Sequence, residues 1–245
     1  ANPITLSLPM QLPEQSLGWQ PRILMVITKS SNTTKAPQML VLQQATPREN
    51  YKLWYLVNLL PTENFPDVPA VDTGTLATGV SDSFLSVKLT SLPYMYGDVL
   101  NKGAESKFYE QFDLTSDQFY ASVSQSQQAD LAKLKKANSV KFVHSLGNSN
   151  VFGLLSKADE QGNGGGGLVA MAINDTSVIK PKVRGAAAAV TTVDKKLLLG
   201  ADGSSTGLNI VYQNMMLFYI PVAGKAEKIR LLGASSSILS VKALN

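Results

Sequence analysis

The stretch QMLVLQQATPRENYKLWYLVNLLP, Gln38–Pro61, decides our interpretation of the fold. It contains two apolar runs, Met39–Gln43 and Tyr51–Leu60, separated by a short polar segment. Within that segment Pro47 fixes its own φ and has no N–H to donate, and Asn50 tolerates the backbone conformations of turns. The stretch therefore predicts two antiparallel strands joined by a turn.

The second strand of this hairpin has apolar side chains on both faces. Tyr55, Val57 and Leu59 share one face with Tyr51 and Leu53, whereas Trp54 and Leu56 lie on the other. A strand that is apolar on both faces is typical of a position covered on both sides of a sheet. We expect its aromatic residues to pack in a core rather than to bind a ligand.

Further strands are predicted on both sides of the hairpin. Before it come an extended lead-in, Ala1–Gln20, and the branched run Arg22–Thr28; after it, Asp72–Ser83 is rich in Gly, Thr and Ser and predicts a linker. Later strand candidates are Val140–Leu146, Asn150–Lys157, Gly167–Asn174, Thr176–Lys182, Leu208–Pro221, Lys228–Leu232 and Ile238–Val241. The alanine-rich segment Gly185–Thr192 receives no assignment.

Two helices are predicted between the two groups of strands. Ser91 is a suitable N-cap with Pro93 in the first turn, and Gly103 is expected to weaken or bend this helix before Phe108. Thr115 and Gln118 have the spacing of a capping box for the second helix. Apolar residues at helical spacing mark the two helices: Tyr96, Val99 and Leu100, then Phe119, Val123, Leu131 and Leu134.

The order of elements predicts an α+β fold, because strands, then helices, then antiparallel strands do not alternate as in βαβ proteins. We expect two helix-on-curved-antiparallel-sheet halves: residues 1–83 as a β-rich N-terminal half, and residues 84–245 as helices followed by an antiparallel sheet. This order resembles the nuclear-transport-factor-2-like and cystatin-like folds. Those folds host enzymes, binding proteins and inert scaffolds alike.

Composition narrows the classes of protein further. Of the 245 residues 44% are hydrophobic and only 16% are charged, which is a low charge fraction for a soluble domain. The net charge is +4, yet the densest basic cluster is only Lys133, Lys135 and Lys136. The sequence has no basic stripe interleaved with aromatic residues, so we expect no nucleic-acid partner. Those lysines suit the C-terminal end of a helix.

The chain contains no cysteine, which excludes disulfides, thiolate metal sites and cysteine nucleophiles within it. No apolar run reaches the length of a membrane span, and no signal peptide opens the chain. Because Ala1 is not a methionine, we expect an upstream segment with a signal or an anchor. Many Ser, Thr, Asn, Gln and Gly residues beside few charges favour an exported protein.

Three stretches together resemble a known family: LVLQQATPRENYKLW (Leu40–Trp54), YGDVLNKGAESKF (Tyr96–Phe108) and LLGASSSILSV (Leu231–Val241). They resemble the C-terminal domain, of unknown function, of an uncharacterised family of exported actinobacterial lipoproteins. The resemblance extends from about Arg22 to Val241. It implies a location on the outer side of the bacterial cytoplasmic membrane, held by a lipid anchor on an upstream cysteine that this chain lacks. It implies no catalytic residues.

His144 is the only histidine and shares a strand face with Val140, Phe142 and Leu146. A metal site would need carboxylate partners, and none lies nearby in sequence. A Ser–His–Asp triad needs partners only in space, but no Gly-x-Ser-x-Gly elbow supports one. We expect a structural histidine, or one at the rim of a site.

Two other segments invite a chemical interpretation. The run GNGGGG at Gly162–Gly167 lacks the Gly-Lys-Ser/Thr ending and following helix of a phosphate-binding loop, so a flexible hairpin loop is favoured. The carboxylates Glu105, Glu110, Asp113 and Asp117 near the helix junction could act as an acid–base pair. Acidic residues near the start of a helix more often interact favourably with the helix dipole or face water.

The aromatic residues of the helices are the candidate ligand contacts. Phe108, Phe112, Phe119 and Tyr120 would line the space between helices and sheet in a cone-shaped fold. A filled core is the favoured alternative, and both remain open at this point.

We therefore expect a non-enzymatic, extracytoplasmic binding or interaction domain of a cell-envelope lipoprotein. No cofactor or metal is expected, the partner is an unknown protein or small molecule, and membrane attachment comes only through the upstream lipid anchor. One alternative is a small-molecule or lipid-binding module with an open apolar cavity. Another is a hydrolase or isomerase whose carboxylates converge with a tyrosine or His144 in a cavity of the C-terminal half.

Overall fold

The computed structural model describes residues 5–11, 22–29, 36–44, 46, 48–60, 65–69, 84–146, 151–157, 165–190, 192–200 and 204–244. In this part of the chain, one large antiparallel sheet carries a small number of helices, which confirms the α+β class. The strands of the large sheet are β1 (Thr5–Gln11), β2 (Arg22–Lys29), β3 (Gln38–Gln44), β4 (Lys52–Leu59), β5 (Asn138–Leu146), β6 (Phe152–Leu155), β7 (Gly167–Pro181), β10 (Leu208–Ile220) and β11 (Arg230–Ala243).

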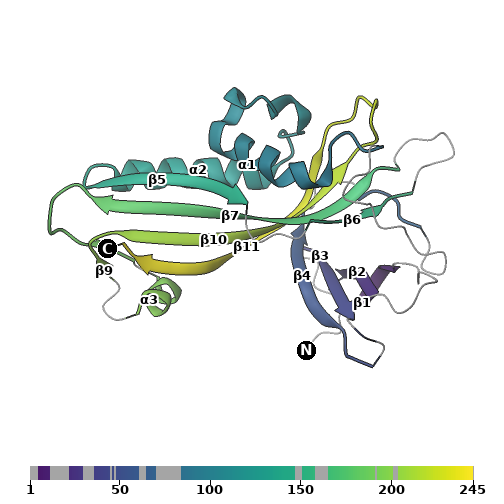
Figure 1. Ribbon diagram of the computed structural model, residues 1–245, viewed down its shortest axis with the longest axis horizontal. Helices are drawn as coiled ribbons and strands as arrows, with labels where there is room; N and C mark the ends of the chain where they lie inside the picture. The colour runs from purple at the N-terminus through teal and green to yellow at the C-terminus, as the bar shows by residue number, and fades with distance from the viewer. Residues whose placement is uncertain are drawn as a thin grey trace.

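The sheet has the order β1-β2-β3-β4-β11-β10-β7-β5, and β6 also pairs with β7. The long strands β7, β10 and β11 run along the longest axis of the molecule, and β1–β4 project from one end (Figure 1). β4 joins β11 through the pairs Leu59↔Gly233 and Asn58↔Ala234. The strands of residues 1–83 thus continue the sheet of residues 84–245, while the expected linker at 72–83 lies outside the described residues.

The predicted hairpin is confirmed as β3 and β4, which pair antiparallel with a register shift after Val41. Val41, Tyr55 and Val57 are buried. At the start of β4, by contrast, Leu53 is 56% exposed, so coverage does not reach this end of the strand. The predicted strand Arg22–Thr28 is confirmed as β2, and part of the expected lead-in forms β1 beside it.

The second half of the chain has fewer and longer strands than the sequence predicts. The separate runs Gly167–Asn174 and Thr176–Lys182 form the single strand β7, because Asp175 stays in the ladder opposite Tyr212. The two closing runs likewise form the single strand β11. A polar residue inside an apolar run is tolerated where a strand passes from a filled core to an open face, and the sequence pattern does not mark that transition.

The two predicted helices are confirmed as α1 (Leu92–Lys102) and α2 (Gln118–Leu134), with corrected ends. α1 stops at Gly103, whose φ of 56° ends the helix instead of bending it, and Phe108 lies in the loop beyond. α2 is capped by Asp117, whose carboxylate accepts the N–H of Tyr120 at 2.8 Å, so the predicted capping box at Thr115 is wrong. A third helix, α3 (Val193–Leu199), and the short strands β8 (Ala188–Ala189) and β9 (Ser204–Ser205) were not predicted.

The core lies on both faces of one end of the sheet. Toward α1, alternate residues of β7 and β10 pack against Leu92, Tyr96 and Val99. The sheet residues on this face are Val169, Met171, Ile173, Met216, Phe218 and Ile220. Burial of such side chains contributes about 1.5–3 kcal/mol each.

The opposite face of the same strands packs against the hairpin. Its residues are Leu168, Ala170, Leu217, Tyr219 and Leu232, and they meet Met39, Val41, Tyr55 and Val57. Instead of two helix-covered halves, the described residues form one sheet end between α1 and the β2–β4 layer, with every described helix at residues 89–199.

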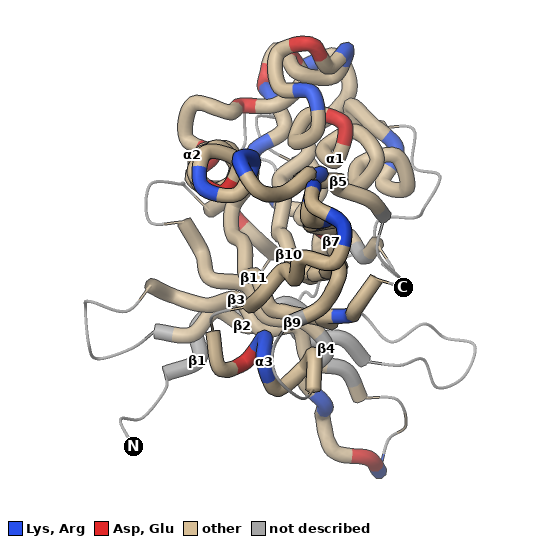
Figure 2. The backbone as a smooth tube through the Cα atoms, turned by 90° about the vertical axis from the view of Figure 1, so that its left-hand side faces the viewer, with Lys and Arg blue, Asp and Glu red and all other residues tan. Residues whose placement is uncertain are grey.

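Charged residues of both signs are interspersed over the helical layer (Figure 2). In the part of the chain that the structure describes, no helix is long and apolar enough to span a membrane.

Candidate functional site

A groove runs beneath α2, over the end of the sheet that lies away from the α1 core. α2 is described over all of its seventeen residues, and none of them is buried. Side chains of α2 and of four strands line a section of about 360 Å³. These are Phe119, Ser122, Val123, Ser126, Gln127, Asp130, Phe142, Asp175, Ser177, Tyr212, Asn214 and Ser236. Space is therefore left along α2 between the helix and these strands.

The groove continues into a second section of about 410 Å³ toward α3. Four residues, Asp130, Phe142, Ser177 and Tyr212, line both sections, which makes the two one continuous groove. The second section is bounded by the 187–190 segment and by Lys133 and Lys195, with Val140, Ile179 and Ile210 on its floor. Ala188, Val190 and Leu208 belong to a small apolar cluster beside this section.

The sequence of β7 and β10 explains why the groove is open. On the face toward the helices, β10 has Phe218 and Met216 at the core end, but Asn214 and Tyr212 follow. On β7, Ile173 is likewise followed by Asp175. Phe119 and Val123 of α2 pack against the α1 core, but the polar side chains beyond it give the rest of the helix less apolar surface to cover.

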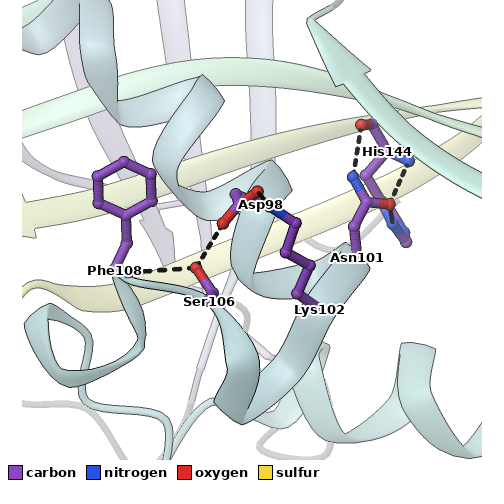
Figure 3. A network of polar contacts seen from close by, with 6 residues as sticks. All are labelled: Asp98, Asn101, Lys102, Ser106, Phe108 and His144. Carbon is purple, nitrogen blue, oxygen red and sulfur yellow. Dashed lines mark hydrogen bonds and ion pairs between the residues drawn. The ribbon is translucent and has the colours of Figure 1, made fainter.

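His144 lies beneath this groove and is enclosed by protein groups. Its side chain is only 1% exposed, with Nε2 3.6 Å from Asp175 Oδ1. Nδ1 lies 3.1 Å from Asn101 Oδ1, and Nε2 lies 3.3 Å from Gln127 Nε2. Asn101 and His144 face each other across α1 and β5 (Figure 3). Because both ring nitrogens face protein side chains, this geometry favours the structural interpretation of His144.

Asp175 presents a carboxylate to the groove from β7. Its side chain is 16% exposed. Its Oδ1 is buried and accepts no hydrogen bond from the described residues. At 3.6 Å, the nearby His144 Nε2 exceeds hydrogen-bonding distance. Tyr212 pairs with Asp175 in the ladder, and both side chains line the groove.

A second polar network, at the end of α1, holds the loop that follows the helix. Asp98 accepts the Ser106 hydroxyl at 2.7 Å and pairs with Lys102 at 2.7 Å (Figure 3). The Lys102 ammonium, the Ser106 hydroxyl and the charge of nearby Lys107 hold the pKa of Asp98 below its ordinary value. Ser106 Oγ in turn accepts the N–H of Phe108 at 3.2 Å, which fixes the loop and not the groove.

The four candidate aromatic residues belong to one hydrophobic cluster around α1, but only one of them lines the groove. Phe119 lines the groove, whereas Phe112 is buried in the α1 core, its ring 5.4 Å from that of Tyr96. Phe108 packs edge-on against Tyr94 at 5.7 Å, and Tyr120 is half-buried at the edge of the same core. Their role in ligand binding stays a prediction.

The residues that form the groove floor were missed by sequence reasoning. Phe142, Asp175, Ser177, Tyr212 and Asn214 come from three strands and meet only through the register of the sheet. One available signal was the placement of Tyr212 and Asn214 on the same strand face as Met216, inside a long apolar run.

Most of the carboxylates near the helix junction are bonded to other groups of the protein. Asp117 is buried, accepts the Tyr96 hydroxyl at 2.7 Å and caps α2. Asp113 accepts the Thr115 hydroxyl at 2.5 Å, and Glu110 pairs with Lys228 at 3.1 Å. Burial, and then the Asp117 charge, raise the pKa of Tyr96 well above its usual range. Among the described residues, no group of three or more His, Asp or Glu side chains could hold a metal ion.

Part of the glycine run also has a structural role. Gly166 is buried, and a Cβ there would lie 2.1 Å from the carbonyl oxygen of Ile220. Close backbone approach therefore requires glycine at this position. Gly167 begins β7, whereas 162–164 lie outside the described residues, so the flexible-loop prediction is untested there.

Comparison with protein-family models, with curated proteins and with solved structures finds no match to this chain. The geometry of the groove therefore carries the functional argument.

Proposed function

We propose that this chain is a non-enzymatic extracytoplasmic binding domain of a cell-envelope lipoprotein, and that the groove beneath α2 is its binding site. One observation carries the proposal: a helix of seventeen residues with none buried spans a sheet face where a groove is lined by both polar and aromatic side chains. A helix that only closed a core would bury an apolar stripe, as α1 does.

The size and lining of the groove favour a small molecule over a protein partner. Its two sections, of about 360 and 410 Å³, have volumes typical of ligand pockets. Phe119, Val123 and Phe142 provide apolar surface, and a few polar groups lie beside them. In ligand pockets, apolar surface typically buries the ligand and the polar groups fix its orientation.

The finer fold assignment and the compartment belong to the same proposal. Helices over one face of a curved antiparallel sheet, with a groove between them, support a nuclear-transport-factor-2-like or cystatin-like arrangement. The absence of cysteine, the low charge fraction and the resemblance of Leu40–Trp54, Tyr96–Phe108 and Leu231–Val241 to an exported lipoprotein family support the extracytoplasmic location.

Native mass spectrometry of the protein purified gently from its host tests the proposal. We expect a bound small molecule that Ser126→Trp abolishes, because the indole would fill the groove from α2. Gln128→Trp, on the exposed side of the same helix, is the matched control and should keep the ligand. Bare wild-type protein, or a ligand that both variants retain, would contradict the assignment of the groove.

A second candidate is a hydrolase or isomerase that uses the same groove. It is favoured by one observation, the Asp175 carboxylate beside Tyr212 on the groove floor, where a carboxylate base could contact a substrate. Incubation of the copurified molecule with the wild type and with Asp175→Asn separates the candidates. Chemical conversion by the wild type alone would replace the binding proposal with the enzymatic one.

A further inference from the structure

The α2 section of the groove has an excess of negative charge. Of the described residues that line it, Asp130 and Asp175 are charged and none is Lys or Arg. This contrasts with the chain as a whole, whose net charge is +4. A ligand seated in this section would therefore meet two carboxylates, whereas Lys133 and Lys195 line the continuing section toward α3.

The deeper carboxylate, Asp175, has His144 Nε2 3.6 Å from its Oδ1, which is beyond hydrogen-bonding distance. Its buried Oδ1 accepts no hydrogen bond within the described part of the chain. The Asp175 side chain is 16% exposed, and a neutral or anionic ligand would cover the exposed part of its carboxylate without supplying a compensating charge, which is costly. A cation would both pair with the carboxylate and donate hydrogen bonds to it.

The walls of the section suit an organic cation better than a metal ion. Phe119, Phe142 and Tyr212 present aromatic surface beside the carboxylates, and aromatic faces attract ammonium groups. The ammonium of Lys195 lies 5.5 Å from the centroid of the Tyr212 ring, so Phe119 and Phe142 are the rings that remain for the ammonium group of a ligand. Among the described residues, no group of three or more His, Asp or Glu side chains is placed to hold a metal ion.

We propose that the α2 section binds a small organic ammonium ion, a protonated amine with an apolar body. This inference rests on the proposed function, because it names the ligand class of the same groove. In the expected complex, the ammonium group lies against Asp175 with Asp130 nearer the rim, and the apolar body lies between Phe119, Val123 and Phe142.

The test is an NMR titration of the full chain with three probes of similar length: hexylammonium, hexanol and hexanoate. We expect hexylammonium to shift the amide signals of Ser177, Tyr212 and Asn214, with a Kd at least about tenfold below that of hexanol, since a hydrogen bond to a charged group contributes about 1.5–3 kcal/mol. Hexanoate should leave these signals unmoved.

Substitutions test which carboxylate causes the preference for hexylammonium over hexanol. Asp175→Asn should raise the Kd of hexylammonium to that of hexanol and leave hexanol binding unchanged, and Asp130→Asn should have a smaller effect because its carboxylate is exposed. Glu105→Gln removes one negative charge outside the groove and should change neither Kd. If Asp175→Asn does not fold, Ser126→Trp takes its place and should abolish the shifts caused by hexylammonium and hexanol.

The outcomes separate this inference from the proposed function. Equal affinities for the three probes, tighter binding of hexanoate, or shifts confined to residues away from the groove would overturn the amine preference. A copurified neutral or anionic molecule that Ser126→Trp displaces would overturn the amine preference and leave the binding function standing. If no probe binds and the protein purified from its host carries no ligand, both the amine preference and the proposed binding function are contradicted.

Discussion

The carboxamide of Asn101 bonds both backbone groups of His144, donating to its carbonyl oxygen at 3.0 Å and accepting from its N–H at 2.9 Å. His144 lies on β5, which is an edge strand among the described strands. A side chain of α1 thus occupies hydrogen-bonding positions that another strand could take, which is one way to protect a sheet edge. The same contact holds α1 against β5.

Asn101→Ala should lower the free energy of unfolding by about 1–3 kcal/mol, because the backbone groups of His144 lose their side-chain partner. The amide hydrogen of His144 should also exchange faster. Urea denaturation and hydrogen exchange followed by NMR measure the two effects. Gln128→Ala, an exposed amide on α2, is the control and should change stability by less than about 0.5 kcal/mol. Unchanged exchange at His144 would contradict the edge-protecting role.

Tyr55 connects the N-terminal hairpin to the central sheet. Its hydroxyl donates to the carbonyl oxygen of Met216 at 2.7 Å and also contacts that of Met171, and burial raises its pKa well above the usual range. Tyr55→Phe should cost about 1–3 kcal/mol, since it removes a buried hydrogen bond. Tyr51→Phe on the same hairpin, where the side chain is 38% exposed, should be nearly neutral. Equal urea midpoints for the two variants would mean that the Tyr55 hydroxyl does not stabilise the hairpin contact.

The hairpin itself was predictable because its information is local. Pro47 and Asn50 mark the turn, and the apolar runs on each side have the length of strands. The packing of that hairpin was not predictable. Tyr55 meets Met216, a residue far along the chain, and no local pattern indicates such a pairing.

The site was less predictable than the fold, for a physical reason. A pattern of helical aromatic residues cannot distinguish a wall of a groove from a filled core: Phe112 is buried in the core, and Phe119 both packs against that core and lines the groove. Asp175 gives no signal of its own, because its importance comes from the loss of hydrogen-bond partners in the folded state. Such residues become visible only when the register of β5, β7 and β10 is known.

Gly166 should not tolerate a side chain. Gly166→Ala would place a methyl group 2.1 Å from the carbonyl oxygen of Ile220, so the hairpin of β6 and β7 must shift. We expect a loss of more than about 2 kcal/mol, or no folded protein. Gly97→Ala in α1 is the matched control: its Cβ would lie 3.8 Å from the carbonyl oxygen of His144, an ordinary contact. Thermal unfolding of both variants is the measurement, and equal tolerance would contradict the close approach at Gly166.

Asp98 should make stability depend on pH in the acid range. Its pKa is held below the ordinary value of 3.8 by the hydrogen bonds from Lys102 and Ser106. A carboxyl group whose pKa is lowered by folding contributes stability above the unfolded value and loses it as the pH falls through the folded value. Asp98→Asn should therefore lower the melting temperature at pH 7, and the two melting curves should converge as the pH falls from about 4 toward 2.

Glu110→Gln provides the control for that experiment, because it also removes a single carboxylate. Its ion pair with Lys228 lies in solvent, where such pairs contribute little, so the melting temperature at pH 7 should hardly change. If Asp98→Asn stays less stable than the wild type by the same margin at pH 2, the loss comes from the geometry of the side chain and not from its charge. Convergence would show that the ionised Asp98 carboxylate holds the loop after α1 in place.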